Sequence, residues 1–278
     1  MSEPRRALVL GSGGLTGLAW QAGVLAGLSD AGVGLAADLV VGTSAGALLA
    51  ARVAGDEPIG AVIDAVCGRA QRPTPGRITP MVLARLLTAQ LYPSRRHAVA
   101  WLGRRAAAEW TGAASGEWVA ELAAELSGRP WPTSLVVVAT NASTGRPAFF
   151  SARQPADLAL AVAASCAMPG VFPAVRIEDR LYFDGGLRSP ANLDAAGSAD
   201  AVLALAPLAG AIRAYRRPVH QAARLRASGA SVVLLTPDAA GRRAIGVDVL
   251  AADRVDACIE AGRNLGAQCA GQVRAVWC

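Results

Sequence analysis

Short apolar runs alternate along the chain with longer stretches whose apolar residues recur at helical spacing. The expected strands cover residues 7–10, 38–41, 134–140, 147–151, 174–177, 180–183, 201–206 and 231–235. The expected helices cover residues 18–29, 156–167, 218–227 and 247–272, and one more begins at residue 45. A first strand, helix and second strand predict a parallel βαβ unit, and the fifth and sixth strands predict a hairpin. The pattern therefore predicts an α/β fold with a mainly parallel sheet.

Residues 56–133 interrupt this alternation. The stretch is rich in Ala, Arg and Leu, contains seven prolines and carries no strand pattern, so it predicts a helical insertion. Four of the six tryptophans lie in it: Trp101, Trp110, Trp118 and Trp131. They could face a substrate or a membrane, but packing of the insertion against the core is favoured. No linker or repeat divides the chain, so residues 1–278 are expected to form one domain.

The charge of the chain comes from arginine alone. The formal net charge is +6, and all 27 cations are Arg. Five Arg-Arg pairs occur, at residues 5–6, 95–96, 104–105, 216–217 and 242–243. Guanidinium groups bind phosphate, so peripheral contact with an anionic membrane is one interpretation, although dispersed arginines on solvated faces are the more common case. Basic residues do not alternate with aromatic ones, so no nucleic-acid partner is expected.

Cysteine and histidine usage excludes other classes. Five cysteines are scattered without metal-ligand spacing, which favours a reducing, cytoplasmic location. With only His97 and His220, no metal site is expected, and no cofactor is predicted. Glycines interrupt the apolar stretch after Arg5-Arg6, so it is expected to be a buried first strand and not a signal peptide. No run has the length needed to span a bilayer.

A candidate nucleophile lies where the second strand meets a helix. The junction is Gly42-Thr43-Ser44-Ala45-Gly46, the pattern of a nucleophile elbow, in which a sharp turn exposes a serine hydroxyl. Gly42 and Gly46 are expected because side chains two residues before and after the serine would collide. The helix that begins at Ala45 would aim free N–H groups at charge that develops beside Ser44.

A candidate oxyanion site lies in the loop Gly11-Ser12-Gly13-Gly14-Leu15-Thr16-Gly17. Gly13 and Gly14 leave their N–H groups unshielded at the start of a helix, where an anion is favoured. A dinucleotide fingerprint is the competing interpretation. The strict Gly-x-Gly-x-x-Gly register fails here, and the second strand ends without an acidic ribose ligand.

Two residues are candidates for the general base. The order Ser44, Asp184, His220 is that of an α/β-hydrolase triad, but His220 begins an Arg-rich helix and is expected at the surface. Asp184 ends an apolar strand and is followed by Gly185 and Gly186, which let another element approach. Burial beside Leu181, Tyr182 and Phe183 would raise its pKa and make it a better base, so Asp184 is favoured.

Together the Gly11–Gly17 loop, the Ser44 elbow and Asp184-Gly185-Gly186 resemble the patatin-like phospholipase family. The resemblance extends to Ala22-Gly23-Val24-Leu25 and to residues 164–173, and covers about residues 6–210. It implies an α/β/α sandwich and a Ser-Asp dyad that cleaves fatty-acyl esters of lipids through an acyl-enzyme. Ser44 would be the nucleophile, Asp184 its base, and Gly13 and Gly14 the oxyanion donors.

The sequence departs from the family pattern in three places. Ser12 stands where the first glycine of the loop is expected, and Thr16 replaces the usual Arg or Lys. Ser189-Pro190-Ala191-Asn192 follows the Asp motif where Asn-x-Pro is common. The missing loop cation makes a phospholipid preference less secure than acyl-ester hydrolysis. A non-catalytic lipid-binding protein on the same fold is the alternative from another class.

Overall fold

The computed structural model describes residues 4–72, 78–92, 94, 97–103, 120–122, 124–126, 128–154, 156–211 and 213–277. The strands are β1 (Arg6–Leu10), β2 (Leu39–Thr43), β3 (Leu135–Asn141), β4 (Pro147–Ser151), β5 (Val175–Ile177), β6 (Arg180–Asp184), β7 (Ala201–Leu205) and β8 (Ser231–Leu235). The helices are α1 (Gly14–Asp30), α2 (Ala45–Val53), α3 (Ile59–Ala70), α4 (Pro80–Leu91), α7 (Leu158–Cys166), α8 (Pro218–Ala227), α9 (Ala239–Ile245) and α10 (Val255–Trp277). Every strand expected from the sequence is present, with ends shifted by two residues at most.

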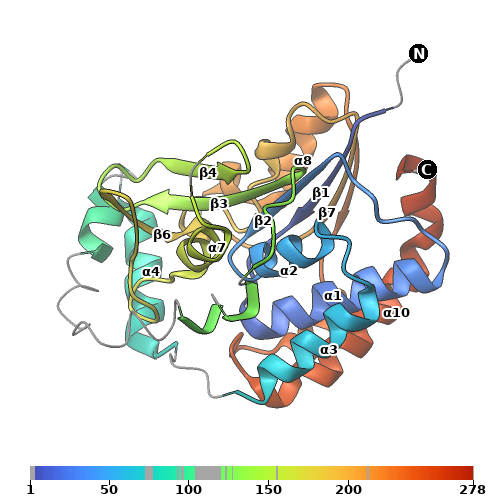
Figure 1. Cartoon of the computed structure of the whole chain (residues 1–278), viewed down its shortest axis with the longest axis horizontal. Coiled ribbons are helices and arrows are strands. Elements are labelled where there is room, and N and C mark those ends of the chain that lie inside the picture. The colour runs from blue at the N-terminus through green and yellow to red at the C-terminus, as the bar shows by residue number, and fades with distance from the viewer. Residues whose placement is uncertain are drawn as a thin grey trace.

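The strands form one mixed sheet in the order β5-β6-β3-β2-β1-β7-β8, with β4 also paired to β3 (Figure 1). Its centre, from β3 through β2, β1 and β7 to β8, is parallel. The pairs β3–β4, β3–β6 and β5–β6 are antiparallel. The prediction of a mainly parallel sheet with a βαβ unit and a hairpin is therefore confirmed.

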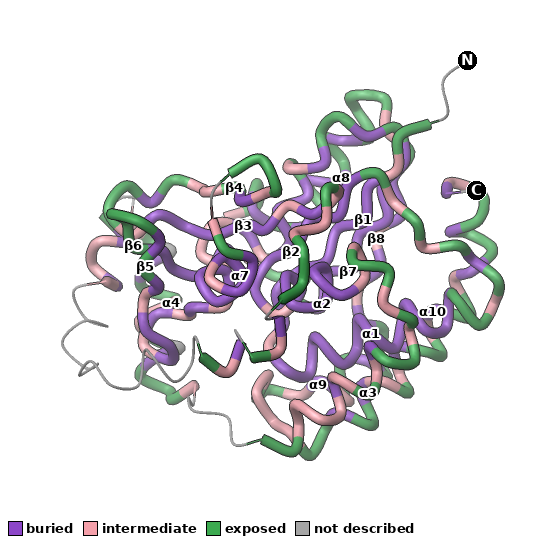
Figure 2. The backbone as a smooth tube through the Cα atoms, viewed as in Figure 1, coloured by how far each residue is buried: buried purple, intermediate pink, exposed green. Residues whose placement is uncertain are grey.

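Helices cover both faces of this sheet and make three layers. Alternate residues of β1 show how the two cores are separated: Leu8 and Leu10 join the cluster that holds α1, α2, α7 and α10. Ala7 and Val9 face the other way, into a smaller cluster with α8. Because both faces are covered, β2 and β7 are buried along their whole length and β1 and β3 along all but one residue each, and Figure 2 shows this buried centre.

Helix α1 carries the glycine loop at its start and is held by α10. A methyl group on Gly23 would lie 2.2 Å from the carbonyl oxygen of Ile259, and one on Gly262 would lie 2.2 Å from that of Trp20. Glycines on both helices thus allow their backbones to touch. This contact fixes the axis of α1 and the direction in which its N-terminus points.

Two helix boundaries predicted from the sequence are wrong. Helix α1 begins at Gly14 and not at Leu18, so most of the glycine loop is the first turn of the helix. The closing helix begins at Val255 and not at Val247, because the segment before it contacts the start of α1. The carbonyl oxygen of Val249 accepts the Thr16 N–H at 3.1 Å, which gives an N–H of the first turn of α1 an acceptor.

The described parts of the insertion are α3, α4 and short helical stretches at 97–103, 120–122 and 124–126. Trp131 donates its indole N–H to the Leu135 carbonyl at 3.3 Å, and Trp101 packs on Tyr92 with ring centroids 5.8 Å apart. Both contacts are internal packing, as expected. Trp110 and Trp118 lie outside the described residues, and the division of the chain into domains stays a prediction. None of the helices in the described ranges is both long and apolar enough to cross a bilayer.

Candidate active site

The turn between β2 and α2 holds Ser44 in a strained conformation. Its φ is 56° and its ψ is −130°, a region that non-glycine residues rarely occupy. A methyl group on Gly42 would lie 2.5 Å from the Cα of Ala47, and one on Gly46 would lie 2.3 Å from the Leu10 carbonyl oxygen. The crowding expected at Gly42 is thus present within the turn, whereas Gly46 is required by the adjacent strand β1, and only glycine fits at these two positions.

Pairing along one strand brings Asp184 to Ser44. Strand β4 occupies one edge of β3, so β2 and β6 must share the other. On that edge Val138 pairs with Thr43, the last residue of β2, and Ala139 pairs with Asp184, the last residue of β6. The two strands run in opposite directions along this edge, so their C-terminal ends meet. Ser44 Oγ therefore donates a hydrogen bond of 2.7 Å to Asp184 Oδ2.

Burial raises the proton affinity of the Asp184 carboxyl. Only 4% of the residue is exposed, and its second oxygen, Oδ1, accepts the Gly186 N–H at 2.6 Å. Loss of hydration raises the pKa of Asp184 from 3.8 to about 6, and the hydrogen bonds from Ser44 and Gly186 oppose that rise. At neutral pH the group is ionised, yet it binds a proton far more readily than an exposed carboxylate does.

The glycine loop lies beside this pair. Gly11 and Ser12 donate their N–H groups to Leu205 and Pro190 at 3.0 and 2.7 Å, which ties the loop to both flanking segments. The N–H groups of Gly13 and Gly14 find no acceptor among the described residues, and both glycines line the same cavity as Ser44. They are thus available to a ligand oxygen.

Packing also requires these two glycines. Added methyl groups would lie 2.8 Å from Cβ of Pro207 at position 13 and 2.4 Å from the Val249 carbonyl oxygen at position 14. Gly14 also has a positive φ of 61°. A larger residue at either position would disturb the fold, so substitution there cannot isolate an oxyanion role.

Ser165 supports the elbow, although the sequence alone did not indicate a structural role for it. The residue is completely buried on α7 and accepts the Ser44 N–H on its hydroxyl oxygen at 2.8 Å. The same hydroxyl donates to the Val138 carbonyl at 2.6 Å. It thereby holds the backbone of the nucleophile to strand β3. The sequence could have indicated this role, because Ser165 lies in residues 164–173, which carry part of the family resemblance.

Asn192 supports the site from the other side of the sheet. The residue is fully buried and left-handed, with φ of 53°, and its Nδ2 donates to Thr43 Oγ1 at 3.1 Å and to the Gly185 carbonyl at 3.3 Å. It therefore joins the residue before Ser44 to the residue after Asp184. The sequence showed Asn192 only as a departure from the family pattern, because its position 149 residues from Thr43 hides the contact.

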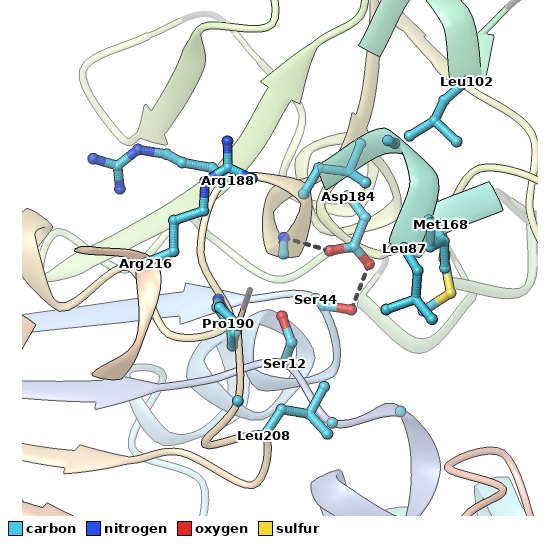
Figure 3. A pocket seen from close by; sticks show the side chains of 18 of the residues that line it. Ser12, Ser44, Leu87, Leu102, Met168, Asp184, Arg188, Pro190, Leu208 and Arg216 are labelled. Atoms are coloured by element: carbon cyan, nitrogen blue, oxygen red, sulfur yellow. Dashed lines mark hydrogen bonds between the residues drawn. The ribbon is translucent and has the colours of Figure 1, made fainter. Parts of the chain in front are cut away.

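Figure 3 shows the cavity, of about 230 Å³, into which Ser44 and Asp184 face. Leu87, Leu102 and Met168 form one wall. Arg188, Pro190 and Arg216 lie on the opposite side. A smaller cavity of about 70 Å³, lined by Leu48, Leu122 and Phe172, also reaches Ser44. The serine thus lies between two largely apolar spaces, the larger of which has arginines on one side.

Neither histidine lies near the Ser44 hydroxyl. His220, on α8, is exposed, as the sequence predicts, and so is His97. Neither lines either of the two cavities that reach Ser44. Within the described part of the chain, the side chain that accepts a hydrogen bond from the Ser44 hydroxyl is that of Asp184.

Comparison with known proteins decides the family. The model of the patatin-like phospholipase family matches residues 8–196, which include the loop, the elbow and Asp184. The chain belongs to the patatin-like phospholipase family. The sequence-based resemblance is therefore confirmed, and membership supports lipid acyl hydrolysis as the general activity. No curated protein matches the chain.

Two solved structures are similar to the chain. VipD from Legionella pneumophila superimposes with a TM-score of 0.51 at 12% identity, over 98% of this patatin-like chain and 67% of VipD. The type III effector protein ExoU gives a TM-score of 0.43 at 20% identity, over 97% of this chain and 53% of ExoU. The VipD superposition supports the three-layer α/β/α sandwich. This chain is thus shorter than both proteins.

Proposed function

We propose that this patatin-like protein is a serine lipid acyl hydrolase that uses a Ser44–Asp184 dyad. The observation that carries the proposal is the 2.7 Å hydrogen bond from Ser44 Oγ to Asp184 Oδ2 beside an apolar cavity. The raised pKa of Asp184, about 6, supports its role as base. The apolar wall of the cavity suits a fatty-acyl chain.

In this mechanism Asp184 takes the Ser44 proton while the hydroxyl oxygen attacks the ester carbonyl. The free N–H groups of Gly13 and Gly14 would stabilise the oxyanion, together with the N-terminus of α2. Asp184 returns the proton to the leaving alcohol as the acyl-enzyme forms. Water then gives its proton to Asp184 and attacks the acyl carbon, and the Ser44 hydroxyl is restored with release of the fatty acid.

A fluorophosphonate probe tests this proposal, since it phosphonylates an activated serine. We expect labelling of wild-type protein and turnover of p-nitrophenyl butyrate, and loss of both in Ser44→Ala. Ser228→Ala, which changes an exposed serine at the C-terminal end of α8, is the control and should behave as wild type. Equal labelling and turnover in Ser44→Ala would refute the assignment. A wild-type protein that binds lipid but shows neither reaction would favour the non-catalytic alternative.

We also propose that the protein contacts a membrane surface beside the cavity. Helix α4 lines the cavity and exposes apolar side chains: Met81 is 60% exposed, Leu87 46% and Leu91 69%. Such a face beside the cavity would let a lipid enter from a bilayer. We expect Met81→Asp/Leu91→Asp to reduce co-sedimentation with vesicles. Equal binding of wild type to zwitterionic and anionic vesicles at low salt would refute an electrostatic contribution from arginine.

A further inference from the structure

Arg216 is a buried cation without a counter-ion. It lies in the short 3₁₀ helix Ala214–Arg216, is 8% exposed, and lines the cavity that holds Ser44. Its guanidinium has no hydrogen-bond or ion-pair partner among the described residues. It lies only over the ring of Tyr215, 5.6 Å from the centroid. Burial of an unpaired charge is costly, so such a group needs an explanation.

Two neighbouring arginines show what is unusual about Arg216. Arg188 lines the same cavity, but its guanidinium pairs with Asp194 and donates to Asn192 Oδ1 at 2.6 Å. Arg217 is exposed and donates to the Ala211 carbonyl at 2.7 Å. The charge of Arg188 is thus paired with a carboxylate, and Arg217 is open to solvent. Arg216 alone of the three offers a full positive charge inside the cavity.

Two more residues that line the cavity have a buried polar atom without a partner. Among the described residues, five buried side-chain atoms have no hydrogen-bond partner, and three of them belong to residues that line this cavity: Ser12 Oγ, Arg188 Nε and Arg216 Nε. Each of the three can donate a hydrogen bond. A ligand bound to the Arg216 guanidinium would therefore bring acceptor oxygens, and the positive charge favours anionic ones.

The glycine loop cannot supply this charge itself. Thr16, at the position where related loops usually carry Arg or Lys, is completely buried, and its hydroxyl lies 3.4 Å from the Val249 carbonyl oxygen. A cation that contacts the substrate must therefore lie on another wall of the cavity. Figure 3 shows Arg216 on the side opposite Leu87 and Met168. The cavity is therefore amphipathic across the Ser44 hydroxyl.

We propose that Arg216 is a specificity-determining residue of this site, and that its guanidinium forms a subsite for a phosphate group carried by the acyl-ester substrate. The acyl chain lies along the wall of Leu87, Leu102 and Met168, and the phosphate lies against the guanidinium. The planar fork of arginine suits phosphate oxygens. This inference rests on the proposed acyl hydrolase function, whose site it completes.

The first test measures binding without turnover, in the Ser44→Ala background. Calorimetry compares 1-octanoyl-glycerol-3-phosphate with 1-octanoylglycerol, which differ only in the phosphate. We expect the phosphate ester to bind at least tenfold more tightly. The additional change Arg216→Met, which keeps the volume but removes the charge, should abolish this preference, and Arg217→Met should leave it intact. An unchanged preference in the Arg216→Met protein would overturn the subsite.

The second test measures turnover and separates this inference from the proposed function. In the Ser44-containing protein, the ratio of kcat/KM for the phosphate ester to that for the neutral ester should fall at least tenfold in Arg216→Met. Arg216→Lys should give an intermediate ratio, because it keeps the charge without the fork. If the ratio is unchanged while both esters are hydrolysed, the subsite is wrong and the hydrolase stands. Binding preference without any hydrolysis would instead refute the hydrolase and leave the subsite intact.

Inorganic phosphate distinguishes the source of the anion. If the subsite serves a phosphate attached to an acyl chain, millimolar phosphate should inhibit neutral-ester hydrolysis weakly and competitively, and 1-octanoyl-glycerol-3-phosphate should compete at far lower concentration. Equal potency of inorganic phosphate and the phosphate lipid would assign the subsite to free phosphate and overturn the substrate proposal.

Discussion

Replacing Asp184 with Asn should stabilise the protein at neutral pH while it removes activity. The carboxyl is 4% exposed, and its pKa rises from 3.8 to about 6 because burial penalises the charged form. Below pH 3.8 the group is protonated in both folded and unfolded chains, so it causes no pH-dependent loss of stability. Above about pH 6 it is ionised in both, and the folded state carries the full cost of the buried charge.

The size of this cost follows from the two pKa values. Each pKa unit corresponds to about 1.4 kcal/mol, so the rise from 3.8 to about 6 amounts to about 3 kcal/mol. Asparagine cannot ionise and does not carry that cost. At pH 4 about 0.5 kcal/mol of this cost is already present, because the unfolded carboxyl is more than half ionised. The free energy of unfolding of Asp184→Asn, relative to wild type, should therefore be about 2.5 kcal/mol higher at pH 8 than at pH 4. Taking the difference between two pH values cancels the effect of any contact that the amide changes equally at both.

Urea unfolding of both proteins between pH 4 and pH 8 measures this difference. The matched control is Asp179→Asn in the β5–β6 turn, where the carboxylate is 81% exposed and should add little. A pH profile of Asp184→Asn that runs parallel to wild type would show that the carboxyl is not desolvated. A gain at pH 4 that disappears at pH 8 would show the opposite sign and refute the reasoning.

The remaining predictions concern the proton carrier and the two supporting residues. In His97→Ala/His220→Ala, kcat/KM should remain above a tenth of wild type, a loss below about 1.4 kcal/mol, with the acid limb still near pH 6; a loss of several orders of magnitude would favour a triad. This variant is needed because an ordinary histidine also titrates near 6.5. Ser165→Ala leaves the buried Ser44 N–H without its acceptor and should cost about 1–3 kcal/mol in urea unfolding, whereas unchanged stability would argue against that support. Asn192→Ala should lower kcat more than it raises KM in a folded protein, since Thr43 and Gly185 lose their common donor, and a change in KM alone would contradict this role.

The sequence by itself determined the local pieces of this protein. The central strands could be found because burial on both faces demands a continuous apolar run, as in Ala201–Leu205. The elbow could be found because Gly42 and Gly46 are required by collisions within a few residues of Ser44 and with the adjacent strand. The hairpin of β5 and β6 is equally local. These features depend on neighbours in sequence, and the pattern therefore contains them.

Tertiary structure decided how these pieces meet. Asp184 reaches Ser44 only because β2 and β6 end head to head on one edge of β3, a pairing across 140 residues that no periodicity encodes. The burial that raises the pKa of Asp184 comes from the same assembly. The sequence predicted Val249 within the closing helix, but Val249 lies outside it, and its carbonyl oxygen accepts an N–H of α1. Arg216 looked like one more surface arginine, because a sequence shows charge but not whether a counter-ion lies within reach.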